Sequence, residues 1–177
     1  MRSQFVRVGA CMFLAAFALC AAPATAQDQK DYLSSTEAEK VRESIDPNER
    51  IHLFLSFASD RLKQLQYELE HPANTVRRSE RLNGLLNAFS SLLDEAVDRM
   101  ELSVEKQEDV REGIKEIQTQ APQFLTYLTD SAAKNPESKT YKENLDDAIA
   151  SAKDAIQSAG DAGKENAPPP APVRRPQ

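Results

Sequence analysis

The sequence predicts an all-α protein, an antiparallel up-down helical bundle of four long helices preceded by a short N-terminal helix. Glycine is scarce, with five in 177 residues, so few positions favour tight turns. Apolar residues recur at alternating spacings of four and three, which is the 3.5-residue period of a left-handed coiled coil. Four separate segments share this period, and the short connections between them favour antiparallel neighbours with left-handed, coiled-coil-like packing.

Residues 1–26 have the composition of a cleaved signal peptide. Arg2 and Arg7 precede an apolar run over residues 8–22, and Ala24 and Ala26 form a small-residue cleavage site. The run is shorter than the ~20 residues that span a bilayer as a helix, which favours cleavage over retention as an anchor. We therefore expect a periplasmic or secreted bacterial protein that uses the general export pathway and keeps no stable membrane anchor after signal cleavage.

The charge and cysteine content exclude several classes of function. The chain has 22 Lys and Arg against 28 Asp and Glu, and both cysteines, Cys11 and Cys20, lie in the signal segment. The mature chain therefore has no disulfide framework, no cysteine-based metal site and no thiol nucleophile. Its acidic charge predicts no binding to nucleic acid, because such binding depends on a basic surface.

The bundle domain is predicted to cover residues 27–160 and begins with a short helix over residues 35–45. A strong helix start follows: Asp46 is placed to cap free amides, Pro47 suits the first helical position, and Glu49 completes an arrangement like a capping box. The first long helix runs to Pro72, which cannot continue it. Its predicted core positions are Ile51, Leu55, Ala58, Leu62, Leu65 and Leu69.

Three further segments repeat the same spacing. A turn near Ser103, which can cap the third long helix, is predicted where the apolar phase of the second helix is lost. Pro122 lies inside the third pattern without breaking its phase, and Asn135 and Pro136 predict the start of the fourth helix. The predicted core positions are Leu82, Leu86, Phe89, Leu93, Ala96 and Met100; Val110, Ile114, Ile117, Ala121, Phe124 and Leu128; and Tyr141, Leu145, Ala148, Ala152, Ala155 and Ala159.

Residues 161–177 are rich in proline and alanine. This composition cannot bury enough apolar area to offset the entropy of ordering. We expect a disordered tail with local polyproline structure.

The two histidines are the candidates for cofactor ligands. His52 and His71 each follow a glutamate at the Glu-x-x-His spacing that di-iron bundles use. Both lie on the first long helix, ~28 Å apart along its axis, and neither occupies a predicted core position. Covalent haem attachment needs a Cys-x-x-Cys-His motif, which the sequence lacks. We predict no cofactor and no metal, and the alternative is a metal- or haem-binding four-helix bundle that uses His52 or His71.

The sequence also lacks G-x-S-x-G and H-E-x-x-H, two motifs that position catalytic residues. The acidic residues of the third long helix alternate with Lys and Arg at i,i+3 spacing, which is typical of a solvated face. We therefore predict that the protein is not an enzyme. It is expected to be a non-catalytic binding, scaffold or chaperone-like module of the bacterial envelope.

One feature suggests a surface for a protein partner. Leu53 and Phe57 form a second apolar stripe on the first long helix, beside the main line of core positions. The interpretation that we favour is that Val41 and Ile45 of the short helix cover this stripe. The alternative is an exposed patch for a partner or for a second copy of the chain. Self-association through the helical patterns is equally consistent with the sequence.

Overall fold

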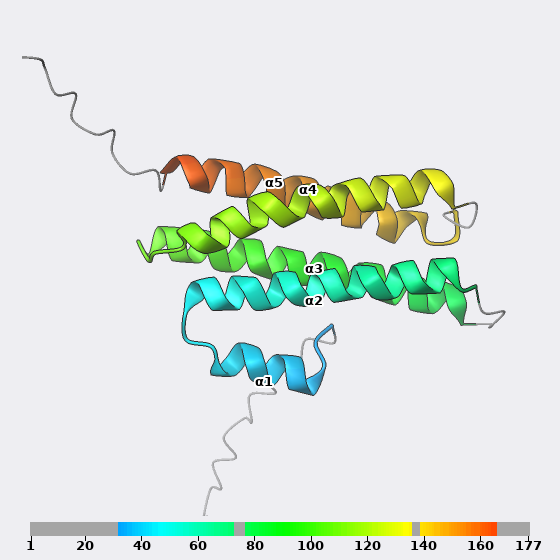
Figure 1. The fold of residues 1–177 in the computed structure, drawn as a ribbon, viewed down its shortest axis with the longest axis horizontal. Coiled ribbons are helices and arrows are strands. Elements are labelled where there is room, and N and C mark those ends of the chain that lie inside the picture. The colour runs from blue at the N-terminus through cyan, green and yellow to red at the C-terminus, as the bar shows by residue number, and fades with distance from the viewer. Residues whose placement is uncertain (1–31, 73–76, 136–138, 166–177) are drawn as a thin grey trace, which may run out of the picture.

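A computed structural model describes residues 32–72, 77–135 and 139–165 of the chain. These residues form an all-helical fold with five α-helices: α1 (Ser35–Glu43), α2 (Pro47–Glu70), α3 (Arg78–Glu105), α4 (Arg111–Lys134) and α5 (Lys142–Glu165). Figure 1 shows α2 beside α3 and α4 beside α5, with α1 lying against α2 on the side away from α4 and α5. The predicted signal segment, including Ala24 and Ala26, lies outside the described residues.

The bundle core consists of the side chains that the apolar period predicted. Every predicted core position is buried except Leu69, which is half-buried. Phe89 of α3 and Phe124 of α4 meet edge to face at the centre of the bundle, with ring centroids 5.5 Å apart. The prediction succeeded because a helix with one apolar stripe must turn that stripe toward its neighbours to bury it.

The start of α2 also follows the prediction, except for the role of Glu49. Asp46 accepts a hydrogen bond from the Asn48 N–H at 3.1 Å, and Pro47 is the first helical residue. The Glu49 carboxylate, however, accepts from the Ser44 hydroxyl at 2.9 Å. Glu49 therefore links α2 to the residue that follows α1. The prediction that Glu49 completes a capping box with Asp46 is not what the structure shows.

The long helices form two pairs, α2 with α3 and α4 with α5. α3 lies mainly against α2 and α5. Its backbone approaches that of α4 at few points, although α4 follows it in the chain and Phe89 meets Phe124. In the second pair, the Gln118 amide of α4 donates to the Ala159 carbonyl of α5 at 2.8 Å. Between the pairs, Asn48 at the start of α2 accepts a hydrogen bond from the Gly113 N–H at the start of α4 at 2.9 Å.

The connection between α3 and α4 differs from the prediction. α3 continues to Glu105, and Ser103 lies inside it, where its hydroxyl donates to the Glu108 carboxylate at 2.7 Å. The prediction that Ser103 caps the next helix is therefore wrong, and Val110 occupies that position. Gln107 makes the turn with a φ of 60°, a conformation that glycine adopts more readily, so no turn residue marked this site in the sequence.

The fourth long helix also has different ends from those predicted. Asn135 closes α4, since its N–H donates to the Ser131 carbonyl at 3.1 Å, and α5 begins at Lys142. Residues 136–138, with the predicted Pro136 start, lie outside the described residues. α5 continues past Gly160 to Glu165, and Ala162 extends its buried line. Residues 161–165 therefore belong to α5. Of the predicted tail, residues 166–177 lie outside the described residues.

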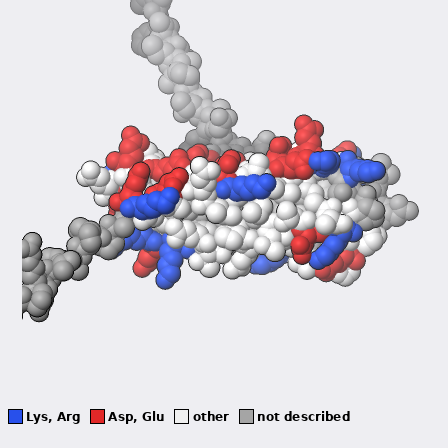
Figure 2. All heavy atoms as spheres, turned by 90° about the horizontal axis from the view of Figure 1, so that it is seen from above, with Lys and Arg blue, Asp and Glu red and all other residues white. Residues whose placement is uncertain are grey.

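The described helices differ in the charge of their outer faces. Figure 2, which views the molecule from the side of α4 and α5, shows an uncharged stretch on this face, with charged side chains at both ends of the bundle and along the edges of the stretch. α4 contributes to this stretch, because it has no charged residue between Glu116 and Asp130. None of the helices within residues 32–72, 77–135 and 139–165 is both long and apolar enough to cross a membrane.

Candidate binding groove

The outer side of α2 carries a line of residues that faces the N-terminal segment. Arg50, Leu53, Phe57 and Arg61 are spaced by three or four residues, so they share one face of the helix. The Arg50 guanidinium donates to the Ser44 carbonyl at 2.7 Å, just after α1. The Arg61 guanidinium donates to the Tyr32 carbonyl at 3.0 Å, just before α1. The two arginines therefore hold the two ends of the segment formed by residues 32–44, which we call the strap.

The strap is fastened most firmly at its first turn. Glu37 and Arg61 form an ion pair at 2.7 Å, and their side chains are only 16% and 13% exposed. Ser34 caps α1 by accepting from the Glu37 N–H at 3.2 Å, while the Glu37 carboxylate accepts from the Ser34 N–H at 2.8 Å. The Tyr32 hydroxyl reaches across to α3 and donates to Glu95 at 2.8 Å.

The ionised form of Glu37 is stabilised by these contacts. Partial burial by itself raises the pKa of a carboxyl group. The hydrogen bonds from Arg61 and Ser34 and the positive charge of Arg61 outweigh that effect, so the pKa of Glu37 lies below its ordinary value. Glu37 is therefore a charged anchor at neutral pH.

The structure places the two residues of the predicted partner surface beneath the strap. Phe57 is buried, and Leu53 is half-buried against the core. Val41 of α1 packs on the same core, whereas Ile45 is 90% exposed. α1 ends at Glu43, so the exposed Ile45 lies beyond the helix and takes no part in covering the stripe. That the rest of the short helix covers Leu53 and Phe57 stays the interpretation that we favour.

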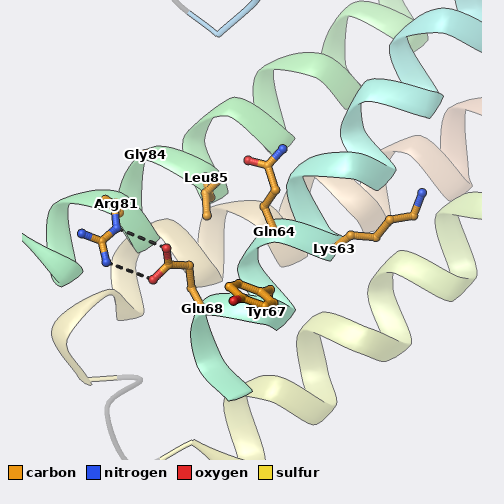
Figure 3. Close-up of a pocket in the computed structure, with 7 residues that line it drawn as sticks. All are labelled: Lys63, Gln64, Tyr67, Glu68, Arg81, Gly84 and Leu85. Atoms are coloured by element: carbon orange, nitrogen blue, oxygen red, sulfur yellow. Dashed lines mark hydrogen bonds and ion pairs between the residues drawn. The ribbon is translucent and has the colours of Figure 1, made fainter. Parts of the chain in front are cut away.

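Beyond Arg61, the space between α2 and α3 is open. It forms a groove of about 490 Å³ lined by Lys63, Gln64, Tyr67 and Glu68 from α2 and by Arg81, Gly84 and Leu85 from α3. Figure 3 shows the Gln64 and Leu85 side chains between the two helices, with no side chain at Gly84. A Cβ atom added at Gly84 would meet nothing within 4 Å, so this wall of the groove is free space. We call it the open groove.

An ion pair closes the far end of the open groove. Arg81 holds the Glu68 carboxylate through two nitrogens, at 3.3 and 3.0 Å (Figure 3). The hydrogen bond from Arg81 keeps the pKa of Glu68 below its ordinary value, although its slight burial acts in the opposite direction. Tyr67 is 63% exposed and stacks on His71 with ring centroids 4.4 Å apart. The open groove thus offers an exposed aromatic ring and a fixed charge pair, which suit recognition of a polypeptide segment better than a chemical reaction.

The two histidines lie far apart in the structure. His52 is near the start of α2, with its Nδ1 atom 2.8 Å from a Glu116 oxygen on α4. His71 ends α2, with its Nδ1 atom 3.1 Å from the Tyr67 carbonyl. In the described residues no three His, Cys, Asp or Glu side chains come together as metal ligands would. The structure therefore does not bring the two predicted ligand candidates together.

Sequence reasoning missed the residues that form the open groove. Tyr67, Gly84 and Arg61 were not singled out. A signal was present, because the stripe through Leu53 and Phe57 continues at the same spacing through Arg61 to Gln64. What the sequence does not contain is the position of α3, which supplies the second wall. Comparison with protein-family models, with curated proteins and with solved structures finds no match to this chain.

Proposed function

We propose that this chain is a non-catalytic binding module of the bacterial envelope, with scaffold or chaperone-like action, and that it holds a polypeptide segment in the open groove. The observation that carries the proposal is that the same α2–α3 surface already holds a polypeptide segment, the strap, over its other half. An exposed aromatic ring beside an unfilled apolar groove is a common arrangement for a recognition site.

Several finer features belong to the same proposal. Export through cleavage after Ala26 would deliver the bundle to the periplasm or the medium, and the acidic charge favours a soluble envelope protein over a partner of nucleic acid. We propose left-handed, coiled-coil-like packing of up-down helices because all four core lines have the 3.5-residue period. No enzyme activity and no cofactor are proposed.

A photo-crosslinking amino acid at position 84 tests the proposed site directly. Gly84 and Gly160 are both helical glycines whose added Cβ meets nothing within 4 Å, so both positions accept a new side chain. Expressed in the envelope of the native host, the position-84 variant should crosslink to one segment of one protein, identified by mass spectrometry. The position-160 variant on α5 is the matched control.

Two outcomes decide the proposal. Replacing the exposed ring, Tyr67→Ala, should abolish the position-84 adduct without unfolding the bundle, because the side chain of Tyr67 is outside the core. Equal adducts at positions 84 and 160, or an adduct indifferent to Tyr67→Ala, would contradict the assignment of the open groove as the binding site.

The alternative function, a metal- or haem-binding bundle that uses His52 or His71, gains no support from the positions of the two side chains. Metal analysis and an absorption spectrum of the purified protein test it. A stoichiometric metal or a haem absorption band would replace our proposal with this alternative.

A further inference from the structure

The strap and the open groove occupy two halves of one continuous surface. The line of α2 residues under the strap, from Arg50 to Arg61, continues at the same helical spacing to Gln64 and Glu68, which line the open groove. Arg61 stands at the boundary. From Arg50 to Glu68 this surface extends over 18 residues of α2, ~27 Å, whereas the nine residues of α1 cover only ~14 Å of it.

The strap is attached in a way that allows it to leave. α1 has no buried residue. The fixed points of the strap are polar contacts at its two ends: Arg61 and Glu95 hold the first end, and Arg50 and Glu49 hold the second, at Ser44. Partly buried apolar contacts come from a few side chains, Tyr32, Leu33 and Val41. Since stability differs between parts of a protein according to the apolar area each part buries, the strap belongs to the low-stability end of this structure.

The charges on this surface specify what kind of helix fits. The chain is acidic overall, with a formal charge of −6, yet Arg50, Arg61, Lys63 and Arg81 lie along this one strip. Arg61 donates to two groups on the strap, the Tyr32 carbonyl and the Glu37 carboxylate. If the strap left, Arg61 would lose its carboxylate and the Leu53–Phe57 stripe would be uncovered.

We propose that an amphipathic helix of another protein, with an apolar face and a carboxylate that pairs with Arg61, displaces the strap and occupies the whole surface from Arg50 to Arg81. This inference rests on the proposed function, because it takes the open groove as the place where that helix first binds. A helix of about 18 residues gains the open groove, which the strap does not reach, in addition to the strap's own contacts. The strap is then a resident competitor that sets the apparent affinity.

A peptide with the sequence of residues 32–45, labelled with a fluorophore, serves as the probe, because it carries the apolar and acidic groups that this surface is seen to hold. It is added to the full mature chain and to three full-length variants. Glu37→Gln loosens the resident strap but leaves Arg61 for the probe. Arg61→Gln loosens the strap and also removes the recognition group. Glu39→Gln is the matched control, because Glu39 pairs only with Arg42 on the exposed side of α1.

The crossed design predicts different results from two variants that both loosen the strap. Glu37→Gln should bind the probe about tenfold more tightly than the native chain, because a larger fraction of molecules has the surface open. Arg61→Gln should bind it no better than the native chain, and Glu39→Gln should match the native chain. In hydrogen exchange, amides of the chain's own residues 35–43 should lose protection as the probe saturates the Glu37→Gln variant.

Three results would overturn the inference: no gain of binding in Glu37→Gln, binding by Arg61→Gln that is as tight as by Glu37→Gln, or binding that leaves the strap amides protected. A stable dimer of the native chain that exchanges residues 32–44 between copies would also overturn the assignment of the surface to a different protein. Failure here leaves the crosslink at position 84 untouched, since Gly84 lies outside the strap's half. The proposed function and this inference can therefore fail separately.

Discussion

The close approach of α2 and α4 at Gly113 allows a quantitative test of the packing. A Cβ atom at this buried glycine would lie 2.6 Å from the Cδ1 atom of Ile51 and 3.3 Å from its Cβ and Cγ2 atoms. Ile51 is fully buried, so its side chain has no open space to move into. Overpacking of this kind costs about 1–3 kcal/mol, while replacement of a helical glycine by alanine returns about 1 kcal/mol.

Gly113→Ala is therefore expected to be less stable than an alanine variant made at a helical glycine where the new methyl group meets nothing. Gly160→Ala on α5 is that control, and its expected effect is the propensity gain of about 1 kcal/mol alone. The two variants should differ in unfolding free energy by about 1–3 kcal/mol, which urea denaturation followed by circular dichroism resolves. Ile51→Val removes the closest atom and should recover part of the difference in the double mutant. Equal stabilisation by both alanine variants would refute the packing of α2 against α4 described here.

The other predictions concern electrostatics, local stability and processing. The folded pKa of Glu37 lies below the ordinary 4.5, so its stabilisation of the strap is present above that pH and is lost as the pH falls through the lowered pKa. The protection factors of amides 35–43, which correct for the slower intrinsic exchange in acid, should fall on acidification, and less so in Glu37→Gln. Partial desolvation and the charges of Asp98 and Asp154 raise the pKa of Asp94, an otherwise exposed side chain, although Ser151 donates to it. Ionised Asp94 therefore destabilises the fold near neutrality, and Asp94→Asn should gain up to about 0.5 kcal/mol in urea denaturation at pH 7, a gain that should shrink as the pH falls. α5, whose buried residues are one leucine and five alanines, should lose amide protection before α2 and α3. N-terminal sequencing of the exported protein should begin near residue 27, and a retained residue 1 would contradict cleavage.

The parts of this structure that could be predicted were those that depend on local chemistry. The cap at Asp46 and the continuity of α4 through Pro122 follow from neighbouring residues. The burial of nearly every core position follows from a single period along each helix. A turn was predicted near Ser103, but its position at Gln107 could not be. Gln107 is not a glycine, and its left-handed conformation is imposed by the packing of the helices on both sides of it.

Most residues of the open groove could not be identified from the sequence, because they come from two helices whose relative position depends on packing. Leu53 and Phe57 could be identified as a second stripe, but a stripe on one helix does not show which element will cover it. The open groove needs two walls, and Gly84 and Leu85 come from a helix whose position beside Gln64 depends on the whole bundle. Contacts between residues so far apart in the sequence depend on how the whole face of one helix packs against the whole face of the other.

The sequence by itself determined which residues are inside, because an apolar side chain is driven from water wherever its helix finally lies. Only the tertiary structure decided the order of the helices, with α3 beside α5 and nearly out of contact with the following α4. A short connection constrains the distance between two helix ends but not which neighbour each helix packs against. That choice depends on close contacts between whole helix faces, such as Gly113 against Ile51, and these form only when the four helices pack together.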